Sequence, residues 1–136
     1  MTPQDIAYIK YRIEKAKESL EIAKMAFPSS LQSTVNRLYY SCFYSAMAAL
    51  LLEGKVTRRH STACRLFRDT FVTTGEIPSE IARFYTQIFD HRMRGDYEDL
   101  ITFEEDDVKD WIVRTEQFVQ VVTAFVEKRL QDLHNE

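Results

Sequence analysis

The stretch from Asn36 to Leu52 constrains the fold of this chain more than any other part of the sequence. It reads NRLYYSCFYSAMAALLL, and no charged residue occurs from Leu38 to Leu52. A surface helix carries its apolar residues on one face, whereas a helix that is apolar on all sides has to be covered nearly all round. The stretch therefore predicts the central helix of a helical bundle.

The same stretch is a poor candidate for a membrane span. A helix needs about 20 mostly apolar residues to cross a bilayer, whereas the uncharged part is shorter and contains three tyrosines and two serines. The start of the chain has no signal-peptide pattern. Cys42 and Cys64 lie among apolar helical neighbours without a CxxC pair. We therefore expect a cytoplasmic protein without membrane contact, with both thiols reduced in the core.

The length and composition predict one helical domain. A chain of 136 residues can bury roughly two-thirds of its unfolded surface without disulfides or metals. It contains only three glycines and three prolines, whereas a sheet protein of this size needs more turns. We predict a single all-α domain over residues 1–136, an up-and-down bundle of four to five helices.

Capping signals divide the first half of the chain into two helices. Thr2 is the expected N-cap of the first helix, and apolar residues then recur at steps of three and four until Pro28. Ser29 with Gln32 forms a candidate capping box for the central helix. Gly54 marks the end of that helix, because glycine readily adopts the left-handed conformation found there.

The second half of the chain predicts three further helices. One should begin near Thr57 and end at Gly75, and the next should begin at Pro78. The last should begin at Thr102, with Glu105 completing a capping box. This last helix is the longest, and its apolar stripe is wide enough to serve both the bundle and a second subunit. We therefore expect a homodimer.

A group of polar residues lies unexpectedly close to the predicted core. Arg92 continues the inward stripe of the fourth helix one turn after Ile88, so its cation must find a polar partner or extend to solvent. Asn36, Arg37 and Tyr40 lie within one turn at the head of the central helix. We expect Gly95 to turn the chain back, so that Arg92 and Tyr97 lie close together in a cleft near these residues and near the subunit contact.

The net charge of −3 is divided unevenly along the chain. Residues 55–94 carry eight Lys or Arg and four acidic residues, whereas residues 96–110 carry eight acidic residues and one lysine. Two interpretations remain open. The first is a pair of solvated surfaces with an acid-rich helix start, and the second is a basic patch that binds phosphates.

The histidines do not indicate a metal centre. His60, His91 and His134 are scattered, and neither a Glu-x-x-His motif nor a glycine-rich phosphate loop occurs. We therefore expect neither a metal nor a cofactor. His91 points about 100° away from Arg92 on a helix and is expected at the surface. His60 begins a helix, where a neutral, hydrogen-bonded imidazole is favoured.

Four motifs, in this order and spacing, resemble the HEPN domain family. They are Asn36-Arg37-x-Tyr39-Tyr40-x-x-Phe43-x-x-Ala46, His60-Ser61 with Phe67, Phe71-Val72-x-Thr74-Gly75-x-Ile77-Pro78, and Arg92-x-x-x-Asp96-Tyr97. The resemblance extends from Ile6 to about Val126. It implies a HEPN-like bundle that dimerises and is often encoded beside a minimal nucleotidyltransferase as a toxin–antitoxin pair. Many family members are metal-independent ribonucleases.

The family's catalytic pattern is only half present. It pairs an arginine with a histidine four to six residues later, and Arg92 matches the arginine. The histidine would deprotonate a ribose 2′-hydroxyl while the arginine holds the phosphate. Here the corresponding positions hold Tyr97, Glu98 and Asp99. A phenol with a pKa of about 10 is a poor base at neutral pH. We therefore predict weak or absent ribonuclease activity, with Arg92 as the candidate catalytic residue.

Two classes of function remain open. The first is a toxin-like partner of a minimal nucleotidyltransferase that binds RNA or a nucleotide, and the alternative is a non-enzymatic interaction or nucleotide-binding module. Tyr97 also resembles the tyrosine that a transferase modifies with a nucleotide in some paired systems. Asp96 has a purely structural alternative, in which it fastens the loop through Arg92 or Arg94. The candidate binding residues are Asn36, Arg37, Tyr40, Arg94, Asp96 and Tyr97.

Overall fold

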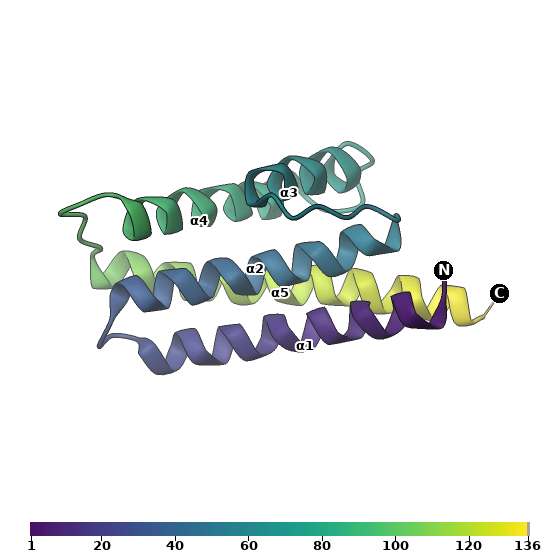
Figure 1. Ribbon diagram of the computed structural model, residues 1–136, viewed down its shortest axis with the longest axis horizontal. Coiled ribbons are helices and arrows are strands. Elements are labelled where there is room, and N and C mark those ends of the chain that lie inside the picture. Colours follow the sequence, from purple (N-terminus) through teal and green to yellow (C-terminus); the bar gives the residue numbers. More distant parts are fainter. Residues whose placement is uncertain (136) are drawn as a thin grey trace.

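A computed structural model describes residues 1–135 as a helical bundle, which confirms the all-α prediction (Figure 1). Four long helices run alternately up and down, and a short helix with a π-helical turn, η1, lies beside the third of them. The elements are α1 (Pro3–Ala26), α2 (Leu31–Leu52), α3 (His60–Phe67), η1 (Arg68–Val72), α4 (Ser79–Tyr97) and α5 (Glu105–His134).

Helix α2 is the central helix, as its apolar sequence predicts. It packs against α1, α3, α4 and α5, and Leu38 and Leu50 are completely buried. Each such leucine stabilises the fold by about 2 kcal/mol relative to an exposed one. The two buried serine hydroxyls of α2 are satisfied within the bundle, because Ser41 donates to the carbonyl of Ala16 (2.7 Å) and Ser45 donates to that of Ser41 (3.0 Å).

The caps of the first two helices agree with the sequence in one case and differ in the other. Thr2 caps α1 as predicted, and its hydroxyl accepts from the backbone N–H of Asp5 at 3.1 Å. The predicted Ser29 cap of α2 is wrong, since the hydroxyl of Ser30 instead accepts from the N–H of Ser33 (3.2 Å). The N–H of Ser30 bonds the carbonyl of Ala26 (2.9 Å), so the turn after α1 extends one residue further.

Helix α3 begins three residues after the predicted start at Thr57. The hydroxyl of Thr57 accepts from the N–H of Arg59 (3.2 Å) and thereby stabilises a turn instead of a helix. The predicted end is confirmed, because Gly75 has φ of +79° and follows the π-helical turn. Phe67 and Phe71 are completely buried, as expected from their spacing.

The connection from α4 to α5 differs most from the sequence prediction. Gly95 does not turn the chain back, because α4 continues to Tyr97. A Cβ atom at Gly95 would lie 2.8 Å from the ring of Phe103, so the glycine here permits close packing instead. The Thr102 cap is also wrong, since α5 begins at Glu105 without a side-chain cap.

The remaining expectations concern the thiols and the membrane. Cys42 and Cys64 are free and buried, as predicted. Burial raises the pKa of the Cys64 thiol to about 12, which keeps it protonated and unreactive at neutral pH. Within residues 1–135, no helix combines the length and hydropathy that a membrane span requires.

Candidate functional site

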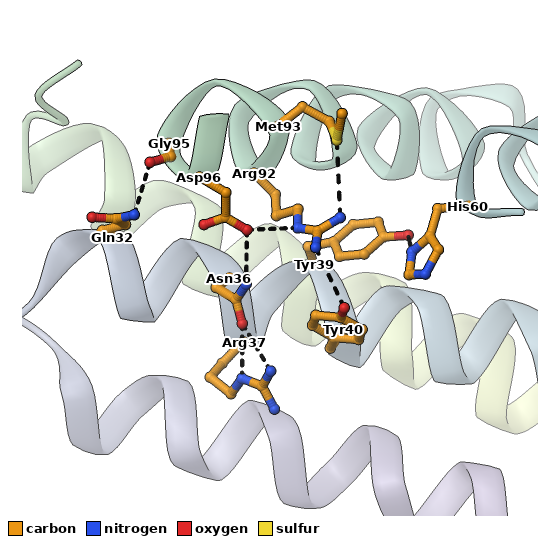
Figure 2. A network of polar contacts seen from close by, with 10 residues as sticks. All are labelled: Gln32, Asn36, Arg37, Tyr39, Tyr40, His60, Arg92, Met93, Gly95 and Asp96. Atoms are coloured by element: carbon orange, nitrogen blue, oxygen red, sulfur yellow. Dashed lines mark hydrogen bonds and ion pairs between the residues drawn. The ribbon is translucent and has the colours of Figure 1, made fainter. Parts of the chain in front are cut away.

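Arg92 lies between α4 and α2, and protein groups enclose its guanidinium (Figure 2). Its side chain is only 11% exposed. Nε donates to Oδ2 of Asp96 at 2.8 Å, Nη2 donates to the hydroxyl of Tyr40 at 3.4 Å, and Nη1 lies 3.9 Å from Sδ of Met93. The helical period explains the pairing, because Asp96 follows Arg92 by four residues and shares its face. Every nitrogen of this guanidinium therefore has a protein partner.

Three tyrosine rings surround the same guanidinium. Its Cζ lies 5.2 Å from the ring centroid of Tyr39, 5.4 Å from that of Tyr40 and 5.7 Å from that of Tyr97. Each such cation–π contact contributes about 0.5–2 kcal/mol, depending on how far it is desolvated. These contacts and the Asp96 carboxylate together explain how the bundle accommodates a mostly buried cation.

A chain of hydrogen bonds leads from Arg92 to the head of α2. Asn36 Nδ2 donates to Asp96 Oδ2 at 3.1 Å, so this oxygen serves both helices. Asn36 Oδ1 in turn accepts from Nε (3.1 Å) and Nη2 (2.8 Å) of Arg37. The Arg37 guanidinium also lies 4.8 Å from the ring centroid of Tyr40. We call Asn36, Arg37, Tyr40, Arg92 and Asp96 the Arg92 cluster. It holds two arginines and one aspartate, and its net charge is therefore positive.

A tyrosine–histidine pair borders the cluster. The hydroxyl of Tyr39 is hydrogen-bonded to Nδ1 of His60, whose ring stacks on Phe43 with centroids 4.4 Å apart. Burial and, to a smaller extent, the charge of Arg92 lower the pKa of His60, and burial raises the pKa of Tyr39. Both groups are therefore neutral at pH 7, as expected for His60. One signal in the sequence could have indicated this pair, because a buried tyrosine hydroxyl needs a polar partner.

Most of the predicted site residues meet, but Arg94 does not join them. It extends to solvent and pairs with Glu98 at 3.7 Å, and both side chains are 56% exposed. Tyr97 lies at the edge of the cluster with 68% of its surface exposed. The prediction that Arg92 lies near Asn36 and Tyr97 agrees with this geometry, and their role in binding remains a prediction.

His91 is not the surface residue that the sequence predicts. It is partly buried and stacks on Trp111, with ring centroids 4.0 Å apart. Burial, followed by the charge of Arg94, lowers the pKa of its imidazole. In the described part of the chain, the site included, no group of three His, Cys, Asp or Glu side chains is placed to hold a metal ion. The site therefore offers guanidinium, amide, carboxylate and phenol groups, with a neutral imidazole at its border.

The fold and this cluster define a helical-bundle protein with an enclosed arginine between two antiparallel helices. The chain belongs to the HEPN domain family, whose profile matches residues 9–129 and so covers the whole cluster. A UPF0332 protein of Thermotoga maritima is 40% identical over 120 residues, which are 88% of this chain and 91% of that protein. Two proteins of Methanocaldococcus jannaschii, both named "Putative toxin", are 30% and 34% identical. The first match covers 71% of this chain and the second 65%, and each covers 67% of its relative.

Proposed function

We propose that this chain is a toxin-like HEPN protein that binds RNA or a nucleotide at the cluster around Arg92. One observation carries this proposal: the hydrogen-bonded chain between α2 and α4 joins Arg92 through Asp96 and Asn36 to Arg37, so that two guanidinium groups accompany one carboxylate. An excess of guanidinium groups over carboxylates suits a phosphate ligand. The names of the two Methanocaldococcus jannaschii relatives support the toxin-like assignment.

We expect any ribonuclease activity of this site to be weak or absent. The positions where the family places its histidine hold Tyr97, Glu98 and Asp99. Loss of a general base typically lowers a rate by about 10²–10⁴-fold. Charge stabilisation by an arginine would have to carry most of any remaining cleavage. The proposed activity is therefore mainly binding.

The second candidate function is a non-enzymatic interaction module. The observation that favours it is the complete set of protein partners around Arg92. An arginine with a protein partner at each nitrogen can join α4 to α2 without any ligand. In that case the bundle would act through its surface, for example by stabilising a partner transferase.

Salt-dependent binding distinguishes the two candidates. Fluorescence anisotropy would be measured with a labelled single-stranded RNA and with a labelled adenine nucleotide at several salt concentrations. If cations of the protein neutralise phosphates of the ligand, the logarithm of the association constant falls linearly with the logarithm of the salt concentration. Arg114→Gln is a matched control for arginine substitutions in the cluster, because Arg114 is exposed on α5 and pairs with Asp110 (2.9 Å). Binding that is absent, or that ignores salt, would favour the interaction module.

The proposed partner is a minimal nucleotidyltransferase, with Tyr97 as a candidate target for nucleotide transfer. The large exposure of the Tyr97 side chain supports this choice. Intact-mass measurement after co-expression should show one added nucleotide, and Tyr97→Phe should remove it. Tyr8 and Tyr11 are about half exposed and far along the chain from the cluster. Nucleotide found on either of them instead would contradict the assignment.

The homodimer also remains a proposal, supported by the wide apolar stripe of α5. Light scattering over a dilution series should give about twice the mass of one chain. A mass of 16.0 kDa at every concentration would contradict it. The cytoplasmic location likewise remains a prediction.

A further inference from the structure

The two arginines of the cluster differ in how far their own protein partners occupy them. Arg92 has a partner at each nitrogen and is 11% exposed. Arg37 directs Nε and Nη2 to one oxygen, Oδ1 of Asn36. Within residues 1–135, Nη1 of Arg37 has no hydrogen-bond partner. A guanidinium carries five N–H groups in a fixed fork. Three hydrogen bonds occupy Arg92 at all of its nitrogens, whereas Arg37 makes two and keeps the whole of Nη1 available.

The distribution of charge points the same way. Asp96 forms its ion pair with Arg92 at 2.8 Å. Among the described residues, no carboxylate lies within 4.0 Å of Arg37, whose only polar partner is the neutral amide of Asn36. The uncompensated positive charge of the cluster therefore resides on Arg37. An anion gains most where a cation has no competing carboxylate.

Tyr40 supplies a second donor beside Arg37. Its ring lies against the Arg37 guanidinium at 4.8 Å. Its hydroxyl oxygen accepts from Arg92 Nη2 at 3.4 Å, which leaves the phenolic O–H itself free to donate. Figure 2 shows Arg37 at the opposite end of the polar chain from Arg92, on the side of α2 that faces α1.

We propose that Arg37 and the Tyr40 hydroxyl form the phosphate-contacting site of this chain, and that Arg92 is a positioning residue. This inference rests on the proposed function and specifies which groups touch the ligand's phosphate. Arg92 fixes Asp96, Asp96 fixes Asn36, and Asn36 holds two nitrogens of Arg37 so that its remaining edge is presented to the ligand. The arginine that matches the family's catalytic pattern thus acts through the other one.

The test compares Arg37→Gln with Arg92→Gln, using a fluorescein-labelled single-stranded RNA at five salt concentrations. Arg37→Gln should lower affinity at least tenfold, as expected for one charge-assisted contact. It should also make the salt slope shallower by about 0.7, the contribution of one phosphate contact on a single strand. Its thermal midpoint should stay near that of the unchanged protein, because the side chain is only partly buried.

Arg37→Lys and Arg92→Gln distinguish contact with the phosphate from structural support. Arg37→Lys should restore the slope but only part of the affinity, because an ammonium keeps the charge and loses the fork. Arg92→Gln should lower the thermal midpoint by several degrees and weaken binding severalfold, with the salt slope unchanged. A purely structural role for Arg37 would leave the slope of Arg37→Gln unaltered.

The outcomes separate this inference from the function on which it rests. If Arg37→Gln binds within twofold of the unchanged protein with the same slope, the assignment of Arg37 is wrong. The Arg37→Gln measurement decides whether Arg37 contacts the phosphate even if Arg92→Gln fails to fold. A shallower salt slope in Arg92→Gln would instead make Arg92 the phosphate contact. Absence of any salt-dependent binding by the unchanged protein would refute the proposed function and, with it, the phosphate site.

Discussion

Two arginines fasten helices of this bundle, and their surroundings are opposite in charge. Arg129 on α5 pairs with Glu53 after α2 (2.8 Å) and with Glu76 before α4 (3.0 Å), and all three side chains are about one-third exposed. Arg92 has one carboxylate partner, Asp96, and lies almost completely inside. The Arg129 cluster therefore carries a net charge of −1.

The difference lies in how completely carboxylates compensate each arginine, and it decides which cluster is a candidate anion site. Arg129 joins the ends of α2 and α5 to the loop before α4, and its charge is more than compensated. In the other cluster a second arginine, Arg37, approaches through a neutral amide and leaves the charge at +1. The excess cation, together with the tyrosine rings, is what makes the Arg92 cluster a candidate for anions.

The largest expected effect separates the two clusters by stability. Asp96→Ala removes the only carboxylate partner of a mostly buried cation and also the acceptor of Asn36. We expect it to lower the free energy of unfolding by about 3 kcal/mol, since an uncompensated buried charge typically costs about 3–5 kcal/mol. Urea denaturation followed by circular dichroism would measure the loss.

Glu76→Ala is the matched change in the Arg129 cluster. Arg129 would keep Glu53, and exposed ion pairs are worth about 0–1 kcal/mol. We therefore expect a loss below about 1 kcal/mol. Equal losses for Asp96→Ala and Glu76→Ala would mean that burial does not distinguish the two clusters.

The sequence predicted the elements of the fold well and their boundaries less well. The uncharged run of α2 and the long apolar stripe of α5 are strong sequence signals for helices, because each reflects the burial of a whole helix face. The starts of α2, α3 and α5 were displaced by one to three residues. At α5 the reason is tertiary: Phe103 packs against Gly95 and lies edge-on to Trp111 at 5.7 Å. No local capping rule contains that contact.

The candidate site was predictable as a set of residues but not as an arrangement. Helical period placed Arg92 inward, and this feature holds. Asp96 was expected in a loop after Gly95, whereas it lies within α4, one turn after Arg92. Sequence spacing could not show that the ring of Tyr39 also lies against Arg92, or that Arg94 turns to solvent. Those facts depend on how α4 is rotated against α2, which only packing between the helices determines.

The second expected effect tests whether net charge separates the clusters in binding as well. Arg129→Gln should lower the free energy of unfolding by about 1 kcal/mol, because two partly exposed ion pairs are lost. Its affinity for the labelled RNA should stay within twofold, with the salt slope unchanged. A weaker slope would show that the Arg129 cluster also contacts phosphate, and the contrast would then fail.

The third effect is a pH dependence confined to the Arg92 end. The folded protein lowers the pKa of His60 below its ordinary value of 6.5 through burial and the charge of Arg92. Below pH 6.5 the unfolded chain therefore binds more protons at this position than the native state. The free energy of unfolding should fall as pH decreases from 7 through 6.5 and below.

His60→Gln tests the origin of that pH dependence. It should make the decrease shallower, although His91, whose pKa is also lowered, will still contribute. Arg129→Gln should retain the full dependence, because its cluster contains no histidine. Urea titrations at pH 7, 6 and 5 would measure these slopes. An unchanged decrease in His60→Gln would assign the effect entirely to other groups.

The smallest effect concerns the glycine that lets the chain pack tightly beside the Arg92 cluster. Gly95→Ala gains about 0.5–1 kcal/mol, because alanine loses less backbone entropy within α4. The added Cβ would lie 2.8 Å from two ring atoms of Phe103, and overpacking usually costs about 1–3 kcal/mol. The ring end of Phe103 can shift, so we expect a net loss of about 1 kcal/mol or less in urea denaturation.

Phe103→Leu provides the control, since the same Gly95→Ala change should then be neutral or stabilising. A loss of equal size in both backgrounds would locate the strain elsewhere, for example at the hydrogen bond from Gln32 to the Gly95 carbonyl (2.8 Å).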